Sequence, residues 1–272
     1  MWRRVIKGEI RERLERLNLP FNRFGLGPFG VSRDHLGLMY TALSRMYHDY
    51  FRVQTLGVEH IPDTGRAMLI GNHSGGLPVD ASMVSAAVFF EHEPPRHAHG
   101  MVEKFANKLP FTSSWFSRLG HLTGLPEHAV RLLEAERVLM VFPEGARGTG
   151  KLYKDRYQLV HFGTGFMRIA LQTGTPIVPF AFVGGEEAIP TIYHAETIAR
   201  LVRAPYFPIT PYGLPIPLPI QCWLLFGEPM VFEGNGTERD ALIEGYVEEV
   251  KQRICELIEE GRRIRRETRA ES

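Results

Sequence analysis

The pattern of apolar and polar positions predicts that the chain begins with helices. Apolar side chains recur at the spacing of one helix face in residues 1–17 and again in residues 32–50. The first stripe consists of Trp2, Ile6, Ile10, Leu14 and Leu17. The segment GLGPFG separates the two patterns. Residues 1–50 are therefore expected to form N-terminal amphipathic helices.

Beyond residue 50, short apolar runs alternate with helical patterns. The runs typical of buried strands are residues 67–71, 98–102, 138–142 and 177–183. The helical patterns are residues 80–90, 127–136 and 165–173, and a last helix is expected from Thr237, which has capping-box spacing to Asp240. This alternation is typical of an α/β fold. We expect a mixed, largely parallel central sheet flanked by helices.

The segment PYFPITPYGLPIPLP, residues 205–219, interrupts this alternation. Its six prolines cannot donate the hydrogen bonds of a central strand, so the segment is expected to be a loop or a sheet edge. Apolar loops are unusual on a protein surface that faces water. Two interpretations stay open, contact with lipid or with an acyl chain, and packing over the sheet.

The charge of the first predicted helix is compatible with binding at a membrane surface. Residues 1–17 contain six Arg or Lys and three Glu, and a basic polar face is typical of helices that lie in an anionic lipid interface. Ordinary packing of this helix on the domain is the alternative. The longest unbroken apolar run, residues 81–90, is half of the roughly 20 residues that a membrane span needs. We therefore expect no transmembrane span.

Composition narrows the class of protein. With 272 residues, 44% hydrophobic and 23% charged, the chain resembles a folded globular protein. A formal charge of +1 argues against a surface that follows nucleic acid. Two cysteines, Cys222 and Cys255, cannot form a four-cysteine zinc site, and His97 and His99 have no partner at diagnostic metal-binding spacing. We predict no metal site and no nucleic-acid partner.

Two glycine motifs suggest phosphate loops but lack essential parts. Gly25, Gly27 and Gly30 have the G-x-G-x-x-G spacing, yet no strand precedes them. The pattern G-x-x-x-x-G-K that ends at Lys151 follows a good strand, but Leu152 stands where a magnesium-binding Ser or Thr is required. Neither motif supports nucleotide binding.

The first candidate for chemistry is LIGNHSGGLPVD, residues 69–80. It places His73 after a strand and before a Gly-Gly loop, and ligands of α/β sheets bind at the carboxyl ends of strands. Imidazole can take a proton from a hydroxyl when a carboxylate fixes its tautomer. Asp80 is the nearest candidate for that carboxylate.

The second candidate is VLMVFPEGAR, residues 138–147, which places Glu144 and Arg147 beyond the same sheet edge. The guanidinium of arginine suits a phosphate or carboxylate. Lys151, Lys154 and Arg156 add positive charge just after it. A histidine base beside an anion site is typical of a transferase.

Together, HSGGLPVD and FPEGAR resemble the motifs H-x-x-x-x-D and F-P-E-G-x-R of the glycerolipid acyltransferases, the superfamily of the 1-acylglycerol-3-phosphate acyltransferases. Lys104 with LPF at residues 109–111, and IVPF at residues 177–180, stand where further family motifs are expected. The resemblance covers about residues 50–230 and implies an acyltransferase domain over residues 51–272.

The resemblance implies that His73 and Asp80 form the catalytic pair and that Glu144, Gly145, Arg147 and Lys104 bind substrate. In this chain six residues separate His73 from Asp80, where the family motif has four. Along a continuous helix that spacing would put the two about 10 Å apart. We therefore expect residues 74–77 to loop out, which Gly75 and Gly76 allow.

The expected function is transfer of a fatty acyl group to a hydroxyl of a glycerolipid acceptor, either a lysophospholipid such as lysophosphatidic acid or a mono- or diacylglycerol. Acyl-CoA or acyl-carrier protein would be the co-substrate, without a further cofactor, and a backbone N–H of Gly75 or Gly76 would stabilise the oxyanion. The protein is expected at the cytoplasmic side of a membrane, peripherally attached. The alternative is a lipid-binding or scaffold protein of the same fold without catalysis.

Overall fold

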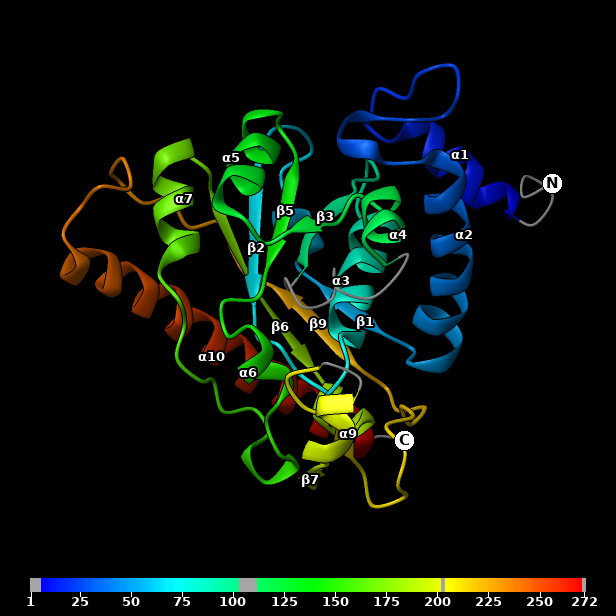
Figure 1. Ribbon diagram of the computed structural model, residues 1–272, viewed down its shortest axis with the longest axis vertical. Helices are drawn as coiled ribbons and strands as arrows, with labels where there is room; N and C mark the ends of the chain where they lie inside the picture. Colours follow the sequence, from blue (N-terminus) through cyan, green and yellow to red (C-terminus); the bar gives the residue numbers. More distant parts are fainter. Residues whose placement is uncertain (1–5, 103–111, 202–203, 271–272) are drawn as a thin grey trace.

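The computed structural model describes residues 6–102, 112–201 and 204–270. Its centre is a seven-stranded sheet with the order β1-β9-β6-β2-β5-β3-β4 (Figure 1). The strands are β1 (Gln54–Leu56), β2 (Ala67–Gly71), β3 (Ala98–Val102), β4 (Leu122–Thr123), β5 (Val138–Val141), β6 (Ile177–Val183) and β9 (Trp223–Phe226). All neighbours are parallel except β6 and β9, which pair antiparallel. The expected mixed, largely parallel α/β fold is confirmed.

Helices cover both faces of the sheet. One face packs against α1 (Gly8–Arg16), α2 (Arg33–Ser44) and α3 (Val79–Phe90), and the other against α5 (Pro126–Glu134), α7 (Gly165–Thr173) and α10 (Asp240–Ala270). Successive side chains of a strand point to opposite faces, so Leu69 belongs to the first core and Met68 and Ile70 to the second. This alternation explains why the central strands are apolar throughout.

The described part of the first apolar stripe packs inside the protein, and Trp2 lies outside the described residues. Ile6, Ile10, Leu14 and Leu17 are all buried in the core that α1 shares with α2 and α3. The basic face also contacts the domain, because Arg13 donates to the carbonyl of Phe89 at 2.8 Å and pairs with Glu93. Of the two interpretations, packing on the domain is the one that the structure shows.

The carboxyl ends of β2, β5 and β6 lie at one edge of the sheet, and the smaller elements gather beyond it. These are α6 (Ala146–Thr149), α8 (Gly185–Ala188), β7 (Tyr193–His194), α9 (Glu196–Leu201) and β8 (Pro208–Ile209). The proline-rich segment contributes only the short strand β8, as expected of a loop. Helix α4 (Thr112–Arg118) lies near β3 (Figure 1).

The start of the last helix differs from the prediction. Helix α10 begins at Asp240 and not at Thr237, whose hydroxyl donates to Asn235 at 2.6 Å. The carboxylate of Asp240 pairs with Arg168 of α7. The predicted capping box is therefore wrong, because local polar partners in the preceding loop and on α7 engage both side chains.

No helix within the described ranges combines the length and the apolar character needed to cross a bilayer.

Candidate active site

The candidate site begins where β2 ends. Asn72 links this end of β2 to β6, since its amide group donates to the carbonyl of Phe182 at 3.0 Å and accepts from the N–H of Phe182 at 2.8 Å. The side chain is fully buried. The residue that follows, His73, therefore leaves the sheet from a rigidly anchored position.

His73 and Asp80 are in direct contact. The Nδ1 atom of His73 lies 2.7 Å from Oδ2 of Asp80, with the imidazole 15% exposed and the carboxylate fully buried. The backbone N–H of Ser74 also donates to Oδ2, and that of Ala81 to Oδ1, each at 2.7 Å. The carboxylate fixes the proton on Nδ1 and leaves Nε2 as the nitrogen that can accept a proton.

The predicted loop between these residues is confirmed, and it explains how six intervening residues are accommodated. Gly75 and Gly76 adopt left-handed φ angles of 90° and 68°, which favour glycine. A Cβ atom on Gly75 would lie 2.7 Å from the carbonyl oxygen of Gly185. The tight turn lets α3 start at Val79, so that Asp80 points back toward His73.

The structure narrows the expectation that a backbone N–H of Gly75 or Gly76 stabilises the oxyanion. The N–H of Gly76, a candidate oxyanion donor, already donates to the carbonyl of Thr149 at 3.1 Å. This bond joins the loop to α6. Of the two glycine amides considered, Gly75 is therefore the one left as a candidate.

Glu144 anchors His73 through the backbone. Its Oε1 accepts from the N–H of His73 at 2.9 Å, and its Oε2 accepts from the N–H of Val160 at 2.9 Å. The carboxylate is fully buried. Because protein donors already occupy both oxygens, this geometry favours a positioning role over the substrate contact that was expected.

Gly145 makes the turn that carries Glu144. Its backbone angles, φ 57° and ψ −151°, lie in a region that is essentially restricted to glycine. Its N–H donates to the carbonyl of Phe142 at 3.0 Å. The glycine of FPEGAR thus serves the shape of the turn directly after β5.

Lys151 and Glu186 extend the buried network, and sequence reasoning did not assign them these roles. The ammonium of Lys151 contacts Oε2 of Glu144 at 3.3 Å, the carbonyl of Gln158 at 3.0 Å and Glu186 at 3.7 Å. Burial raises the pKa of Glu186 to about 7, while the charge of Lys151 acts in the opposite direction. Glu186 lies far along the chain in α8, so no local spacing could reveal the contact.

Of the two basic residues expected to bind substrate, Arg147 lies within the described residues and Lys104 does not. Arg147 lies on α6 with an exposed side chain, and its guanidinium is 3.5 Å from the carbonyl of His161. It is at the predicted edge of the sheet and can meet a ligand from solvent. Lys104 lies outside the described residues, as does the LPF segment at 109–111.

Close packing fixes the imidazole from two further sides. The ring of Phe142 stacks on His73 with centroids 4.1 Å apart and an interplanar angle of 21°. A Cβ atom on Gly148 would lie 2.8 Å from Cβ of His73 and 2.8 Å from Cβ of Glu144. Gly148 is therefore the position where α6 approaches the site most closely, and only its lack of a side chain permits this approach.

Comparison with known proteins agrees with this geometry. Residues 52–183 match the acyltransferase family model, a range that includes His73, Asp80 and Glu144. The chain therefore carries a segment that matches an acyltransferase domain. Its fold is similar to the crystal structure of the 1-acyl-sn-glycerophosphate (LPA) acyltransferase PlsC from Thermotoga maritima, with a TM-score of 0.55, 19% identity, and 82% of this chain and 79% of that chain covered.

Relatives of the acyltransferase domain occur in bacteria and in animals. An uncharacterized protein of Mycobacterium leprae is 36% identical over 234 residues, which cover 83% of this chain and 62% of that protein. A Gallus gallus protein named "DGAT1/2-independent enzyme synthesizing storage lipids" is 26% identical over 212 residues, covering 77% of this chain and 60% of that protein. The chain thus spans less than two thirds of the length of these relatives.

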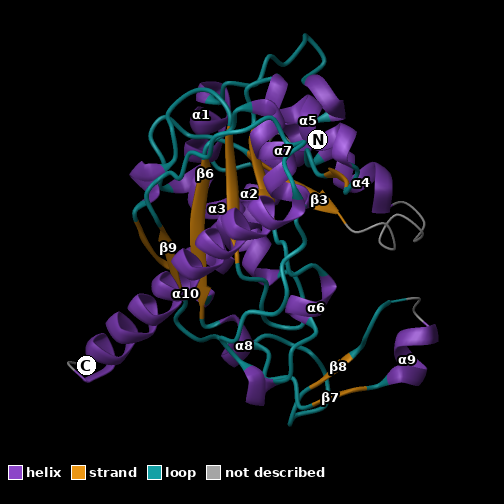
Figure 2. Cartoon of the chain, turned by 90° about the vertical axis from the view of Figure 1, so that its left-hand side faces the viewer, coloured by secondary structure: helices purple, strands orange, loops and turns teal. Residues whose placement is uncertain are grey.

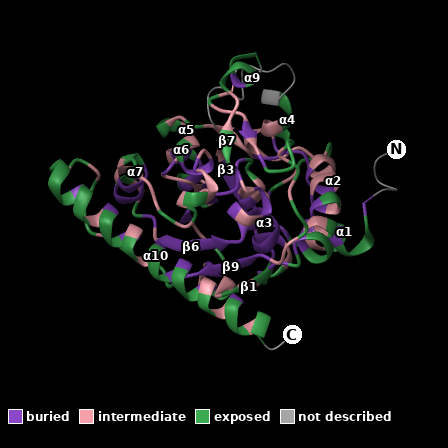
Figure 3. Ribbon diagram, turned by 90° about the horizontal axis from the view of Figure 1, so that it is seen from below, coloured by how far each residue is buried: buried purple, intermediate pink, exposed green. Residues whose placement is uncertain are grey.

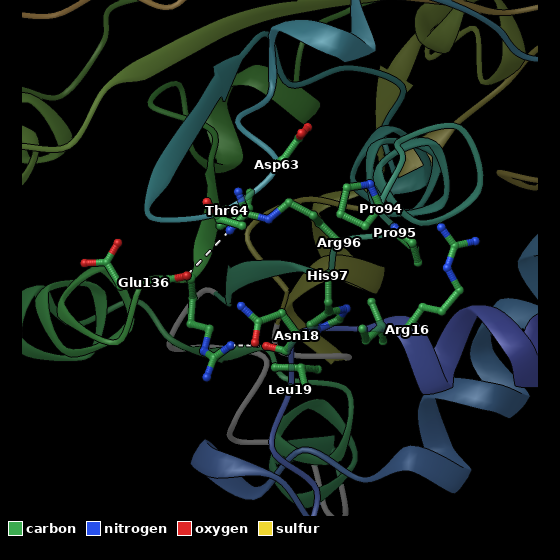
Figure 4. Close-up of a pocket in the computed structure, with 13 residues that line it drawn as sticks. Arg16, Asn18, Leu19, Asp63, Thr64, Pro94, Pro95, Arg96, His97 and Glu136 are labelled. Atoms are coloured by element: carbon green, nitrogen blue, oxygen red, sulfur yellow. Dashed lines mark hydrogen bonds between the residues drawn. The ribbon is translucent and has the colours of Figure 1, made fainter.

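The protein also has a cavity of about 170 Å³ at the opposite edge of the sheet, where β3 and β5 begin (Figure 4). Two arginines in its wall hold nearby backbone. Arg96 donates to the carbonyl of Pro62 at 2.5 Å, and Arg137 donates to the carbonyl of Asn18. These contacts tie loops to the sheet at the edge away from His73.

Replacing Gly148 tests the packing of α6 against the site. Gly148→Ala should lower acyl-transfer activity by about 10- to 100-fold, because the new methyl group must displace His73 or Glu144. Activity is measured together with thermal unfolding. The matched control is Gly245→Ala, an exposed position of α10 where a Cβ meets nothing within 4 Å. Equal activity of both variants would contradict the proposed contact.

The buried Glu186 predicts a dependence of stability on pH. The pKa of Glu186 rises from 4.5 to about 7 on folding. The folded state therefore has its full stability below about pH 4.5 and loses free energy of unfolding as the pH rises toward 7, because only the unfolded chain ionises readily in this range. Glu186→Gln should remove this loss, so the variant gains stability relative to the parent between pH 5 and 8, by at most about 3 kcal/mol.

Urea unfolding at several pH values in this range measures the difference. Glu196→Gln, at an exposed position of α9, serves as the control and should follow the parent. Parallel curves for the parent and the Glu186 variant would contradict the prediction.

Proposed function

We propose that the chain is an O-acyltransferase that moves a fatty acyl group from an acyl thioester, acyl-CoA or acyl-carrier protein, to a hydroxyl of a glycerolipid acceptor. The observation that carries the proposal is the 2.7 Å contact between His73 and Asp80 inside an acyltransferase domain. His73 and Asp80 are assigned as the catalytic pair. Glu144, Gly145 and Gly148 position it.

In the proposed reaction, Nε2 of His73 takes the proton from the acceptor hydroxyl. The hydroxyl oxygen attacks the thioester carbonyl and forms a C–O bond, and the carbonyl becomes a tetrahedral oxyanion. Collapse of this intermediate breaks the C–S bond, and the thiolate receives the proton from the imidazolium. Asp80 stabilises the positive charge on His73 between these two steps.

Two observations bear on the class of acceptor, the exposed Arg147 and the named relative from Gallus gallus. An exposed guanidinium beside the site can bind a phosphate, which suits a lysophospholipid. The relative from Gallus gallus, named for the synthesis of storage lipids, supports a neutral mono- or diacylglycerol instead. Both classes offer the same reacting group, a glycerol hydroxyl, and a panel of acceptors separates them.

Replacing either member of the pair tests the chemistry. His73→Ala should lower the rate by about 100- to 10,000-fold, the usual effect of losing a general base. Asp80→Asn should also lower it strongly, because the amide no longer stabilises the imidazolium. Thioester consumption is measured with purified protein, and His48→Ala, an exposed position outside the site, is the control.

Two outcomes would count against this assignment. A folded His73 variant with activity within tenfold of the parent would remove His73 as the base. A parent protein that consumes no thioester with any acceptor would favour the alternative, a lipid-binding protein that does not catalyse transfer.

Arg147→Ala separates the acceptor classes. If the guanidinium binds a phosphate, the variant should lose about tenfold or more in kcat/KM with lysophosphatidic acid. Turnover of mono- and diacylglycerol should change little, and these acceptors act as the internal control. An equal loss with both classes would show that Arg147 does not recognise phosphate.

A further inference from the structure

Residues 190–201 and 204–221 form a lobe beyond the carboxyl ends of β2, β5 and β6, which we call the apolar lobe. It contains β7, α9 and β8, and these elements project from the body of the domain in Figure 2. Residues 202–203 lie outside the described ranges. The lobe stands at the same edge of the sheet as His73.

The lobe exposes large apolar side chains to an unusual extent. Leu201 is 82% exposed, Leu214 61% and Ile216 59%. The other exposed large apolar residues of the lobe are Ile192, Tyr193, Ile198, Tyr212 and Leu218, and α9 is mostly exposed in Figure 3. Residues 204–221 contain no charged side chain at all. Exposed apolar side chains gathered in one part of a protein are typical of an interaction site.

The lobe is joined directly to the catalytic loop. A Cβ atom on Gly76, three residues after His73, would lie 3.0 Å from Oγ1 of Thr191 and 3.3 Å from Cβ of Pro208. The imidazole of His194 also contacts the carbonyl of Gly150, just after α6, at 2.8 Å. Whatever the lobe docks on is therefore held next to the candidate active site.

The chemistry of the lobe favours a lipid surface over a protein partner. The six prolines of residues 205–219 remove backbone donors that an added strand would need. Tyr193 and Tyr212 combine an apolar ring with a polar hydroxyl, which suits a membrane–water interface. The described members of the first stripe, Ile6, Ile10, Leu14 and Leu17, are buried, so these side chains cannot provide the contact.

Basic side chains border the apolar lobe. Arg52 donates to the carbonyl of Pro219 at 3.1 Å. The exposed Lys154 and Arg156 lie beside Thr191, whose carbonyl accepts from the N–H of Tyr153 at 2.7 Å. Basic residues around an apolar surface are attracted to anionic lipids.

We infer that the apolar lobe is the surface by which this protein docks on an anionic lipid membrane, so that a lipid acceptor enters the site directly from the bilayer. The entry of the acceptor rests on the proposed function, whereas docking itself does not. Insertion of Leu214, Ile216 and Leu201 supplies the apolar contact, and Arg52, Lys154 and Arg156 meet the head groups.

The test measures sedimentation of the full chain with vesicles of phosphatidylcholine that contain about one third phosphatidylglycerol. The double substitution Leu214→Asp with Ile216→Asp should lower the partition coefficient at least about tenfold, because two buried apolar contacts are lost. Both side chains are exposed, so folding should be preserved, and circular dichroism checks this. Val231→Asp is the matched control, since Val231 is 79% exposed and lies near the opposite end of β6, next to Met230, which pairs with Ile177.

The outcomes separate docking from catalysis. Vesicle binding by the double variant equal to that of the parent, or no binding by the parent, would overturn the inference. The inference would also be overturned if the parent binds no vesicles but forms dimers that the double substitution abolishes. The lobe would then be a contact surface between two copies of the chain. If the parent binds vesicles but transfers no acyl group, the proposed function fails and the docking surface stands.

Retention of transfer by the double variant on detergent-dispersed acceptor, with loss on vesicles, is the result expected if both proposals hold. Loss of transfer on both, in a variant that is folded, would show that the lobe shapes the site itself and would overturn a purely docking role.

Discussion

The buried carboxylate of Asp80 is the constraint on which the site depends. A buried carboxylate is costly unless donors surround it, and here the imidazole of His73 and the N–H groups of Ser74 and Ala81 provide them. Two of these donors come from the loop and one from the first turn of α3. The loop, the helix start and the imidazole must therefore adopt their positions together.

A second buried carboxylate connects this arrangement to the rest of the sheet. Glu144, which follows β5, accepts from the backbone N–H of His73, which follows β2, and the two strands are neighbours in the sheet. Lys151, two residues after the end of α6, and Glu186 of α8 then join the network. Because all these groups are buried, a change in any one alters the electrostatic environment of the others. The position of the base is thus a property of three strand ends and not of one motif.

The two edges of the sheet have different tasks. At one edge, Arg96 and Arg137 donate hydrogen bonds to loop carbonyls and hold these loops against the sheet. At the other, α6, the Gly-Gly loop and the apolar lobe surround His73. The N-terminal helices pack on one face between them, since α1 contributes its apolar stripe to the core. Surface apolar residues are consequently concentrated near the candidate active site, where they can serve binding.

The sequence by itself located the strands β2, β3, β5 and β6 and most of the amphipathic helices, because buried strands and amphipathic helices leave patterns in the local spacing of apolar residues. It also located His73, Asp80 and Glu144, since the ends of strands followed by glycine turns are recognisable along the chain. It missed β9, and it missed β1 and β4, which have too few residues for a pattern. It also placed the start of α10 three residues early.

Only the tertiary structure decided which groups meet. The role of Glu186 depends on a contact with Lys151 across 35 positions of the chain, and that of Gly148 on the approach of α6 to His73. The burial of the α1 stripe and the exposure of Leu214 were equally open, because the sequence does not show which apolar side chains find a protein surface to pack against. The hydrophobic effect favours the removal of an apolar side chain from water. Whether a protein core is available to bury that side chain is determined by the packing of the whole chain.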